Sequence, residues 1–187
     1  MDKYTLPKNI LIDGVVCEFD SDYRTVLKIF KILNDPDLLE QERILVALDL
    51  FYTDSTYTVN IQKAAEEMME FLSGGDDYDS SSKPASKPLY DWEQDYKIII
   101  APINKVLGTD VRGLDYLHWW TFLSAFMEIG ECTFNTFVGI RDKLNKNKKL
   151  EKHEEIIYKE NQSRIVLKRK YDSTTQALMD EVLGKGV

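Results

Sequence analysis

The sequence has few of the residues from which metal and catalytic sites are commonly built. Its 187 residues include two cysteines and two histidines. Cys17 and Cys132 lie far apart in apolar segments, so we expect buried reduced thiols of a reducing compartment rather than a disulfide framework. His118 and His153 have none of the spacings of a zinc-binding motif. The sequence therefore predicts no metal site.

Long apolar runs and nucleotide-binding motifs are also missing. The longest apolar stretches span only a few residues, as at residues 98–101, whereas a membrane-spanning helix needs about 20. The chain begins with polar residues and lacks the apolar segment of a secretory signal peptide. It contains no phosphate-binding glycine loop, dinucleotide fingerprint or G-x-S-x-G motif. We therefore expect a cytoplasmic protein that is not an enzyme and binds no cofactor.

The composition itself is typical of a globular protein with an uneven charge distribution. Apolar residues make up 43% of the chain and charged residues 30%, which excludes a wholly disordered chain. The net charge is −8. Residues 1–75 carry 7 basic and 14 acidic side chains, whereas residues 141–170 carry 11 basic and 5 acidic ones. Such opposite charges favour contacts between copies of the chain or with a complementary partner.

The N-terminal residues predict a β-hairpin followed by a helix. Asp13–Gly14 separates two β-prone runs, which is the strongest local signal for a hairpin with a type I′ turn. Asp20 and Asp22 then offer capping oxygens for a helix. Apolar residues at helical spacing continue this helix to Leu33.

Two further helices are expected before residue 73. We expect the second to start near Pro36, whose missing N–H costs nothing at a helix start. Its helical pattern spans Leu38–Tyr52, and the number of apolar residues at its end predicts burial on more than one side. The spacing of apolar residues over 61–72 predicts the third helix, and Ser73–Gly75 ends it.

Residues 73–88 are rich in Ser, Gly, Pro and Asp and lack large aliphatic side chains. This composition predicts a flexible linker, because it cannot bury enough surface to offset the entropy lost on ordering. Beyond it, helices are expected at residues 92–107 with a bend at Pro102, 117–127 as a central enclosed helix, 134–144, Leu150–Tyr171, and Ala177–Leu183.

The pattern as a whole predicts a mainly α fold. We expect bundle-like helical domains with a small N-terminal β-hairpin and a flexible internal linker. The expected parts are residues 1–72, the linker 73–88, and residues 89–187.

Aromatic and methionine residues at helical spacing are candidates for either core packing or partner contacts. Core packing is the usual role of such residues. Two adjacent tryptophans point about 100° apart on a helix, so one of Trp119 and Trp120 can reach a partner unless the helix is packed on several sides. The predicted partner-binding residues are Met68, Met69, Phe71, Trp119, Trp120, Met127 and Phe137.

The basic segment 141–170 admits two other interpretations. It has the charge to bind DNA or RNA. However, glutamates alternate with its lysines, and i,i+4 pairs such as Glu155–Lys159 are typical of an ordinary solvent-exposed helix. Binding to nucleic acid is the less favoured interpretation.

Four blocks of sequence resemble the bacteriophage gene-product-fifteen family. They are LPKNILIDGVVCEFDSDYRTVLKIFKILNDPDLLEQERILVALDLFY, YDWEQDYKIIIAPINKVLGTDV, LHWWTFLSAFMEI and FVGIRDKL. The blocks occur in the family's order and cover most of residues 6–170. The matching positions, to which the resemblance assigns no catalytic role, are Asp22, Arg24, Trp92, Asp95, Trp119, Trp120, Phe122 and Arg141.

This resemblance implies a tail protein of a long-tailed phage or prophage of Gram-positive bacteria. A protein of this family resembles a tail assembly chaperone, which binds the tape measure protein in the host cytoplasm while tail subunits polymerise around it. The implied partners are the tape measure protein and the major tail protein, with self-association as a further expectation. The alternatives are a permanent structural protein of the tail and a small nucleic-acid-binding regulator.

Overall fold

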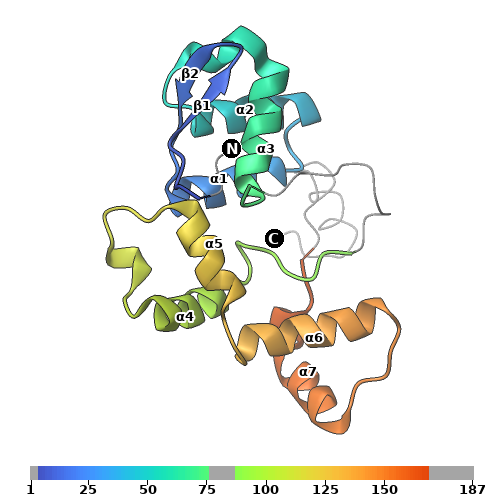
Figure 1. Cartoon of the computed structure of the whole chain (residues 1–187). Helices are drawn as coiled ribbons and strands as arrows, with labels where there is room; N and C mark the ends of the chain where they lie inside the picture. The colour runs from blue at the N-terminus through green and yellow to red at the C-terminus, as the bar shows by residue number, and fades with distance from the viewer. Residues whose placement is uncertain (1–3, 76–86, 169–187) are drawn as a thin grey trace, which may run out of the picture. The chain divides into compact units, whose positions relative to one another are not determined.

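A computed structural model describes residues 4–75 and 87–168 of the chain (Figure 1). The described residues divide into two compact units. We call residues 4–75 the N unit and residues 87–168 the C unit, and each is described by itself. Most of the predicted linker, and the helix expected at Ala177–Leu183, lie outside the described residues.

The N unit begins with the predicted hairpin. Strands β1 (Asn9–Ile12) and β2 (Val15–Glu18) pair antiparallel. Asp13 and Gly14 both have positive φ, 48° and 84°, which is the conformation that a type I′ turn requires at its two central residues. The inward face of the hairpin buries Ile10, Ile12 and Cys17.

Three α-helices and a 3₁₀-helix complete the N unit. They are α1 (Tyr23–Leu33), α2 (Glu40–Phe51), η1 (Ser55–Asn60) and α3 (Ile61–Leu72). Helix α2 packs against both α1 and α3, and the hairpin packs on η1 and α3. The rings of Phe19, Phe51 and Phe71 meet at the centre, with centroids 4.5–5.4 Å apart, so this core joins β2's end to α2 and α3.

Two expectations about α2 were wrong. The helix starts at Glu40, not near Pro36, because the Asp35 carboxylate first accepts a hydrogen bond from the Asp37 N–H and holds a turn. Nor is α2 buried on more than one side. Its buried residues Ala47, Leu48 and Phe51 share one face, whereas Leu45, Val46 and Leu50 remain exposed.

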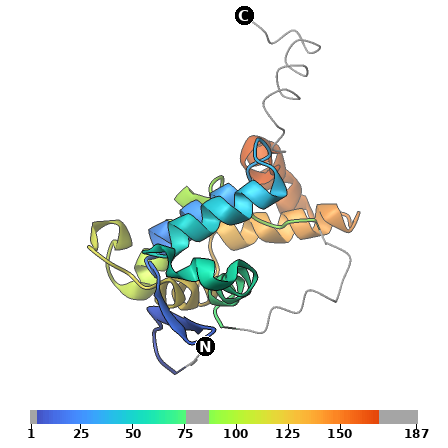
Figure 2. The same ribbon diagram turned by 90° about the horizontal axis from the view of Figure 1, so that it is seen from above.

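The C unit contains four α-helices and one 3₁₀-helix. They are α4 (Tyr96–Leu107), η2 (Val111–Gly113), α5 (Trp119–Met127), α6 (Thr133–Asn145) and α7 (Lys152–Ile165). Helix α4 packs on α5 and α6, and α6 packs on α7. Helices α6 and α7 lie side by side in both views (Figures 1 and 2). The fold class is thus confirmed as mainly α with a small N-terminal hairpin.

Two helix starts in the C unit differ from expectation. Helix α4 starts at Tyr96 with Asp95 as its N-cap residue, so Trp92 lies before the helix and not in its stripe. Pro102 lies inside α4. Helix α5 starts two residues later than expected, because the His118 imidazole accepts a hydrogen bond from the Trp120 N–H and caps it.

Helix α7 ends at Ile165, earlier than the predicted Tyr171, and residues 166–168 are not helical. The predicted Glu155–Lys159 ion pair is not formed among the described residues. Side chains from other segments donate hydrogen bonds to the backbone carbonyls at this helix end.

Candidate functional site

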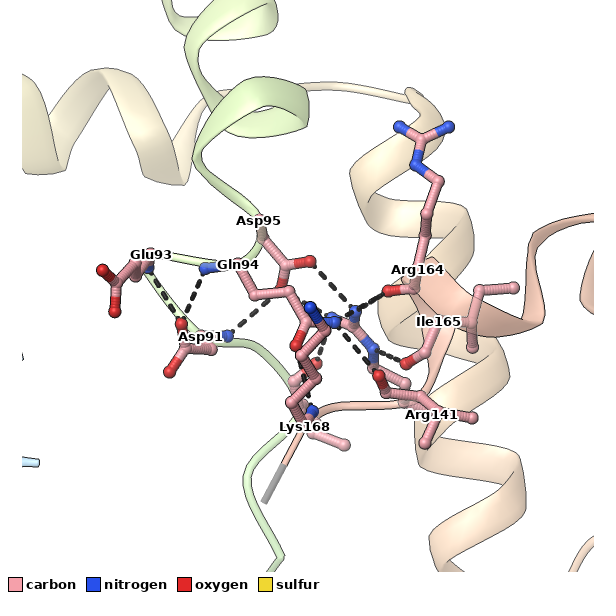
Figure 3. A network of polar contacts seen from close by, with 10 residues as sticks. Asp91, Glu93, Gln94, Asp95, Arg141, Arg164, Ile165 and Lys168 are labelled. Atoms are coloured by element: carbon pink, nitrogen blue, oxygen red, sulfur yellow. Dashed lines mark hydrogen bonds and ion pairs between the residues drawn. The ribbon is translucent and has the colours of Figure 1, made fainter. Parts of the chain in front are cut away.

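The most extensive polar cluster in the described chain surrounds the buried Arg141 of α6. Its Nη1 and Nη2 donate to the two Asp95 carboxylate oxygens at 2.7 and 2.9 Å. Its Nε donates to the Ile165 carbonyl at 2.6 Å, and the remaining N–H groups reach the carbonyls of Leu89 and Arg164 at 3.0 and 2.9 Å (Figure 3). All five guanidinium donors are therefore engaged.

Gln94 extends this cluster along the chain leaving α7. Its side-chain amide donates to the carbonyls of Arg164 and Val166 at 3.0 and 3.1 Å, and its oxygen accepts from the Lys168 N–H at 3.0 Å. Figure 3 shows Gln94 and Arg141 converging on this segment. These side chains donate hydrogen bonds to the backbone carbonyls at the end of α7. The carbonyls therefore have partners even though the helix does not continue. We call Gln94, Asp95 and Arg141 the clasp.

The clasp is an architectural feature of the C unit. It ties the segment before α4 to α6 and to the end of α7. Asp95 and Arg141 are 46 positions apart in the sequence, and Arg141 and Ile165 are 24 apart. The side chains are only 5% exposed for Arg141 and 2% for Asp95, and every guanidinium N–H already has an acceptor within the chain. A buried bidentate pair with every donor satisfied fixes the register of the segments that it joins.

The other family-pattern residues also have structural contacts. Asp22 caps α1 by accepting a hydrogen bond from the Arg24 N–H at 2.9 Å, and it pairs with the Arg24 guanidinium at 3.2 Å. Trp92 packs edge-on against Trp119 with ring centroids 5.8 Å apart. It also lies 6.2 Å from Phe122. The cap at Asp22 confirms the role predicted from the sequence, whereas the contacts of Trp92 with Trp119 and Phe122 were not predicted.

The structure separates the predicted partner-binding residues into buried and exposed ones. The buried residues are Met68, Phe71, Trp119, Trp120 and Phe137, all less than 9% exposed. Met69 is half-buried, and Met127, at the end of α5, is 69% exposed. The two units hold different members of the set: α3 carries three and the C unit four. Of the seven, Met127 offers a partner the most surface, and binding by any of them stays a prediction.

The outer face of the hairpin is an exposed apolar surface that sequence reasoning missed. Leu11 is 60% exposed and Val16 57% exposed, and the two residues are directly paired across the strands. Outward positions of a small antiparallel hairpin are usually polar because they face water. The alternation of strand side chains was the available signal, because inward Ile10 and Cys17 require outward Leu11 and Val16.

A groove of about 620 Å³ adjoins this hairpin. It is lined by residues 5–11 and by Glu67 of α3. Burial and the neighbouring Glu70 carboxylate raise the pKa of Glu67 above its ordinary value. The groove therefore has both polar and apolar lining residues, and one carboxylate whose charged form is disfavoured.

Both cysteines are free thiols. Cys17 is buried as predicted, whereas Cys132, the residue before α6, is partly exposed. Within residues 4–75 and 87–168, no group of three or more His, Cys, Asp or Glu side chains is arranged to hold a metal ion. The helices in these same ranges are all too short or too polar to cross a bilayer.

Comparison with known protein families gives one match. The model of the bacteriophage Gp15 protein family matches residues 3–167. The chain belongs to this bacteriophage Gp15 family. The match spans both units, from the hairpin to the clasp at the end of α7, so this Gp15 protein carries the family's sequence across its whole described fold. No curated protein and no solved structure matches the chain.

Proposed function

We propose that this Gp15 protein is a non-catalytic tail assembly chaperone that binds the tape measure protein in the cytoplasm of the host. Membership of a phage family supports a role in phage particles or their assembly. The observation that carries the chaperone role is the apolar outer face of the hairpin, where Leu11 and Val16 stay more than half exposed in the folded N unit. A surface of this kind is costly in water unless a partner covers it.

The form of this surface fits a helical partner held weakly. Each strand has four residues, so the face accommodates about one or two turns of an amphipathic helix laid across it. One such contact is small compared with a stable interface. Many copies along a long helical protein provide avidity while each copy stays displaceable. A chaperone must be displaced from the tape measure protein when tail subunits polymerise around it.

Co-expression with the tape measure protein of the same phage tests this function. The intact chain is expected to keep that protein in the supernatant and to co-purify with it. A Leu11→Ser, Val16→Ser double variant is expected to lose most of this effect while its circular dichroism remains that of the intact chain. Val166→Ser removes an apolar side chain that is 48% exposed in the C unit and serves as the matched control.

Two outcomes would contradict the proposal. One is a tape measure protein that is equally insoluble with and without the intact chain. The other is solubilisation that both variants reduce alike, because the hairpin face would then have no special part in it. Recovery of the chain with DNA or RNA in a salt-sensitive complex would instead support a nucleic-acid-binding regulator.

A further inference from the structure

One stripe of exposed residues on α2 carries two carboxylates, each of which accepts a hydrogen bond inside the N unit and still remains exposed. Glu42, Val46 and Asp49 are spaced i, i+4 and i+7, so they lie along one side of the helix. All three are exposed, with Val46 at 37%. They face away from the buried residues Ala47 and Phe51. The stripe therefore presents an apolar side chain between two carboxylates.

Helix α7 of the C unit carries the opposite pattern. Lys152, Ile156 and Lys159 have the same i, i+4, i+7 spacing and are all exposed, with Ile156 at 58%. Among the described residues, neither lysine has an ion-pair partner. Glu155 and Glu160 project to either side of this stripe and not along it. The stripe presents an apolar side chain between two ammonium groups.

Helix stability does not explain two of these charges. Lys152 lies in the first turn of α7 and Asp49 in the last turn of α2. The helix dipole disfavours a cation at the N-terminal end and an anion at the C-terminal end. One oxygen of Asp49 accepts a hydrogen bond from the Tyr57 hydroxyl, and the carboxylate remains exposed. Both charges are exposed, and an opposite charge on an external partner would offset the unfavourable dipole interaction.

We propose that the α2 stripe of one copy docks on the α7 stripe of a second copy. In the parallel orientation the stripes match residue for residue: Glu42 faces Lys152, Val46 faces Ile156, and Asp49 faces Lys159. The charged residues of each stripe are about 10.5 Å apart along the helix axis, since a helix rises about 1.5 Å per residue. The two surfaces differ, so the contact is heterologous and builds a ring or an open chain of copies.

This inference does not depend on the proposed function, because it concerns the purified protein alone. Each docking contact is small, so association is weak and depends on concentration. Exposed charge pairs are screened by salt. Sedimentation velocity over a range of concentrations is therefore expected to show larger species at low salt and mainly monomer at about 0.5 M salt.

Charge reversal on α7 is the first test. The Lys152→Glu, Lys159→Glu variant breaks no ion pair of the described structure, and it is expected to weaken self-association at least tenfold (about 1.4 kcal/mol). The control Lys148→Glu, Lys149→Glu makes the same charge change in the exposed loop between α6 and α7. It is expected to change self-association no more than about twofold.

Mixing complementary variants is the decisive test. Glu42→Lys, Asp49→Lys is expected to weaken self-association at least tenfold as well, with folding checked by circular dichroism. Mixed with the reversed α7 variant, it is expected to restore larger species, because each surface again meets the opposite charge in a different molecule. Docking of the two stripes within one chain would give no such restoration.

Several results would overturn the proposal. They are a wild-type chain that is monomeric at all concentrations, an α7 variant that associates as well as its control, and mixed variants that remain monomeric while both are folded. Loss of the association on nuclease treatment would also overturn it, since nucleic acid would then bridge the copies.

Discussion

At the scale of single residues, the clasp is the feature on which the C unit most depends. Arg141 and Asp95 are buried, and the charges of each are offset only by the other and by nearby dipoles. Removing one partner leaves an uncompensated buried charge, which is more costly than the pair's own net contribution. The clasp therefore fixes the arrangement of α4, α6 and the end of α7 more than it adds stability.

Arg141→Ala is expected to lower the free energy of unfolding by about 3–5 kcal/mol, because the Asp95 carboxylate and three carbonyls lose their donor. Urea denaturation measures this change. The control Lys146→Ala breaks an exposed pair with Asp142 and is expected to cost less than about 1 kcal/mol. Equal losses for the two variants would show that burial gives the clasp no special role.

Glu67 gives a prediction that depends on pH. Burial and Glu70 raise the pKa of Glu67 in the folded chain, so the folded state binds this proton more tightly than the unfolded state. Stability therefore falls as pH rises from the ordinary carboxylate range through the raised pKa, and is constant above it. Glu67→Gln removes this loss.

At pH 7, Glu67→Gln is expected to unfold at a higher urea concentration than the unaltered chain. The difference should vanish when the pH falls below the ordinary range of a glutamate. Glu66→Gln, which removes one negative charge from an exposed position of α3, is the control. A destabilised Glu67→Gln variant at pH 7 would contradict the assignment of Glu67 as a disfavoured charge.

At the scale of elements, caps and turns were the most predictable features. Asp13–Gly14 predicted the hairpin turn and Asp22 the start of α1, because these signals act over a few residues. Boundaries set by distant groups were not predictable. Helix α7 ends where Gln94 and Arg141 take its carbonyls, and nothing in the sequence near Ile165 indicates this.

Substitutions at two glycines test how backbone conformation affects stability, and they are expected to have opposite effects. Gly14 has a φ of +84°, which an L side chain rarely adopts, although a Cβ there would meet no atom within 4 Å. Gly14→Ala is therefore expected to destabilise the chain by about 1 kcal/mol through the backbone alone. Thermal unfolding measures the effect.

Gly139 is the matched position, since it lies inside α6 and a Cβ there also meets nothing within 4 Å. Alanine is the better helix former, so Gly139→Ala is expected to stabilise by up to about 1 kcal/mol. If Gly14→Ala and Gly139→Ala both stabilised or both destabilised the chain, backbone conformation would not explain their effects.

At the scale of the whole molecule, sequence patterns predicted the fold class and not the surfaces. Apolar spacing indicates that a residue lies on a helix face, but neighbouring elements decide whether that face is covered. Trp119 and Phe137 were therefore candidates for contact and proved to be core, whereas Leu11 and Val16 were expected as strand residues and proved to be exposed. Likewise, the net charge of −8 does not indicate that α2 and α7 carry exposed stripes of opposite charge.

The clasp was also beyond sequence reasoning. Arg141 and Asp95 are 46 positions apart, and neither has a neighbour in the sequence that indicates an ion pair. The resemblance to a phage family singled out both residues without a role. Only the three-dimensional contacts show that the two side chains link the segment before α4, helix α6 and the end of α7.

The proposed chaperone function requires that this Gp15 protein acts during tail assembly and then leaves the particle. The most direct measurement is its quantity, by mass spectrometry, in lysates of infected or induced cells and in purified mature particles of the same phage. We predict that the chain is abundant in the lysates during assembly and absent from the particles. Its presence in the particles in a fixed ratio to the major tail protein would contradict the chaperone function and identify a permanent component of the tail.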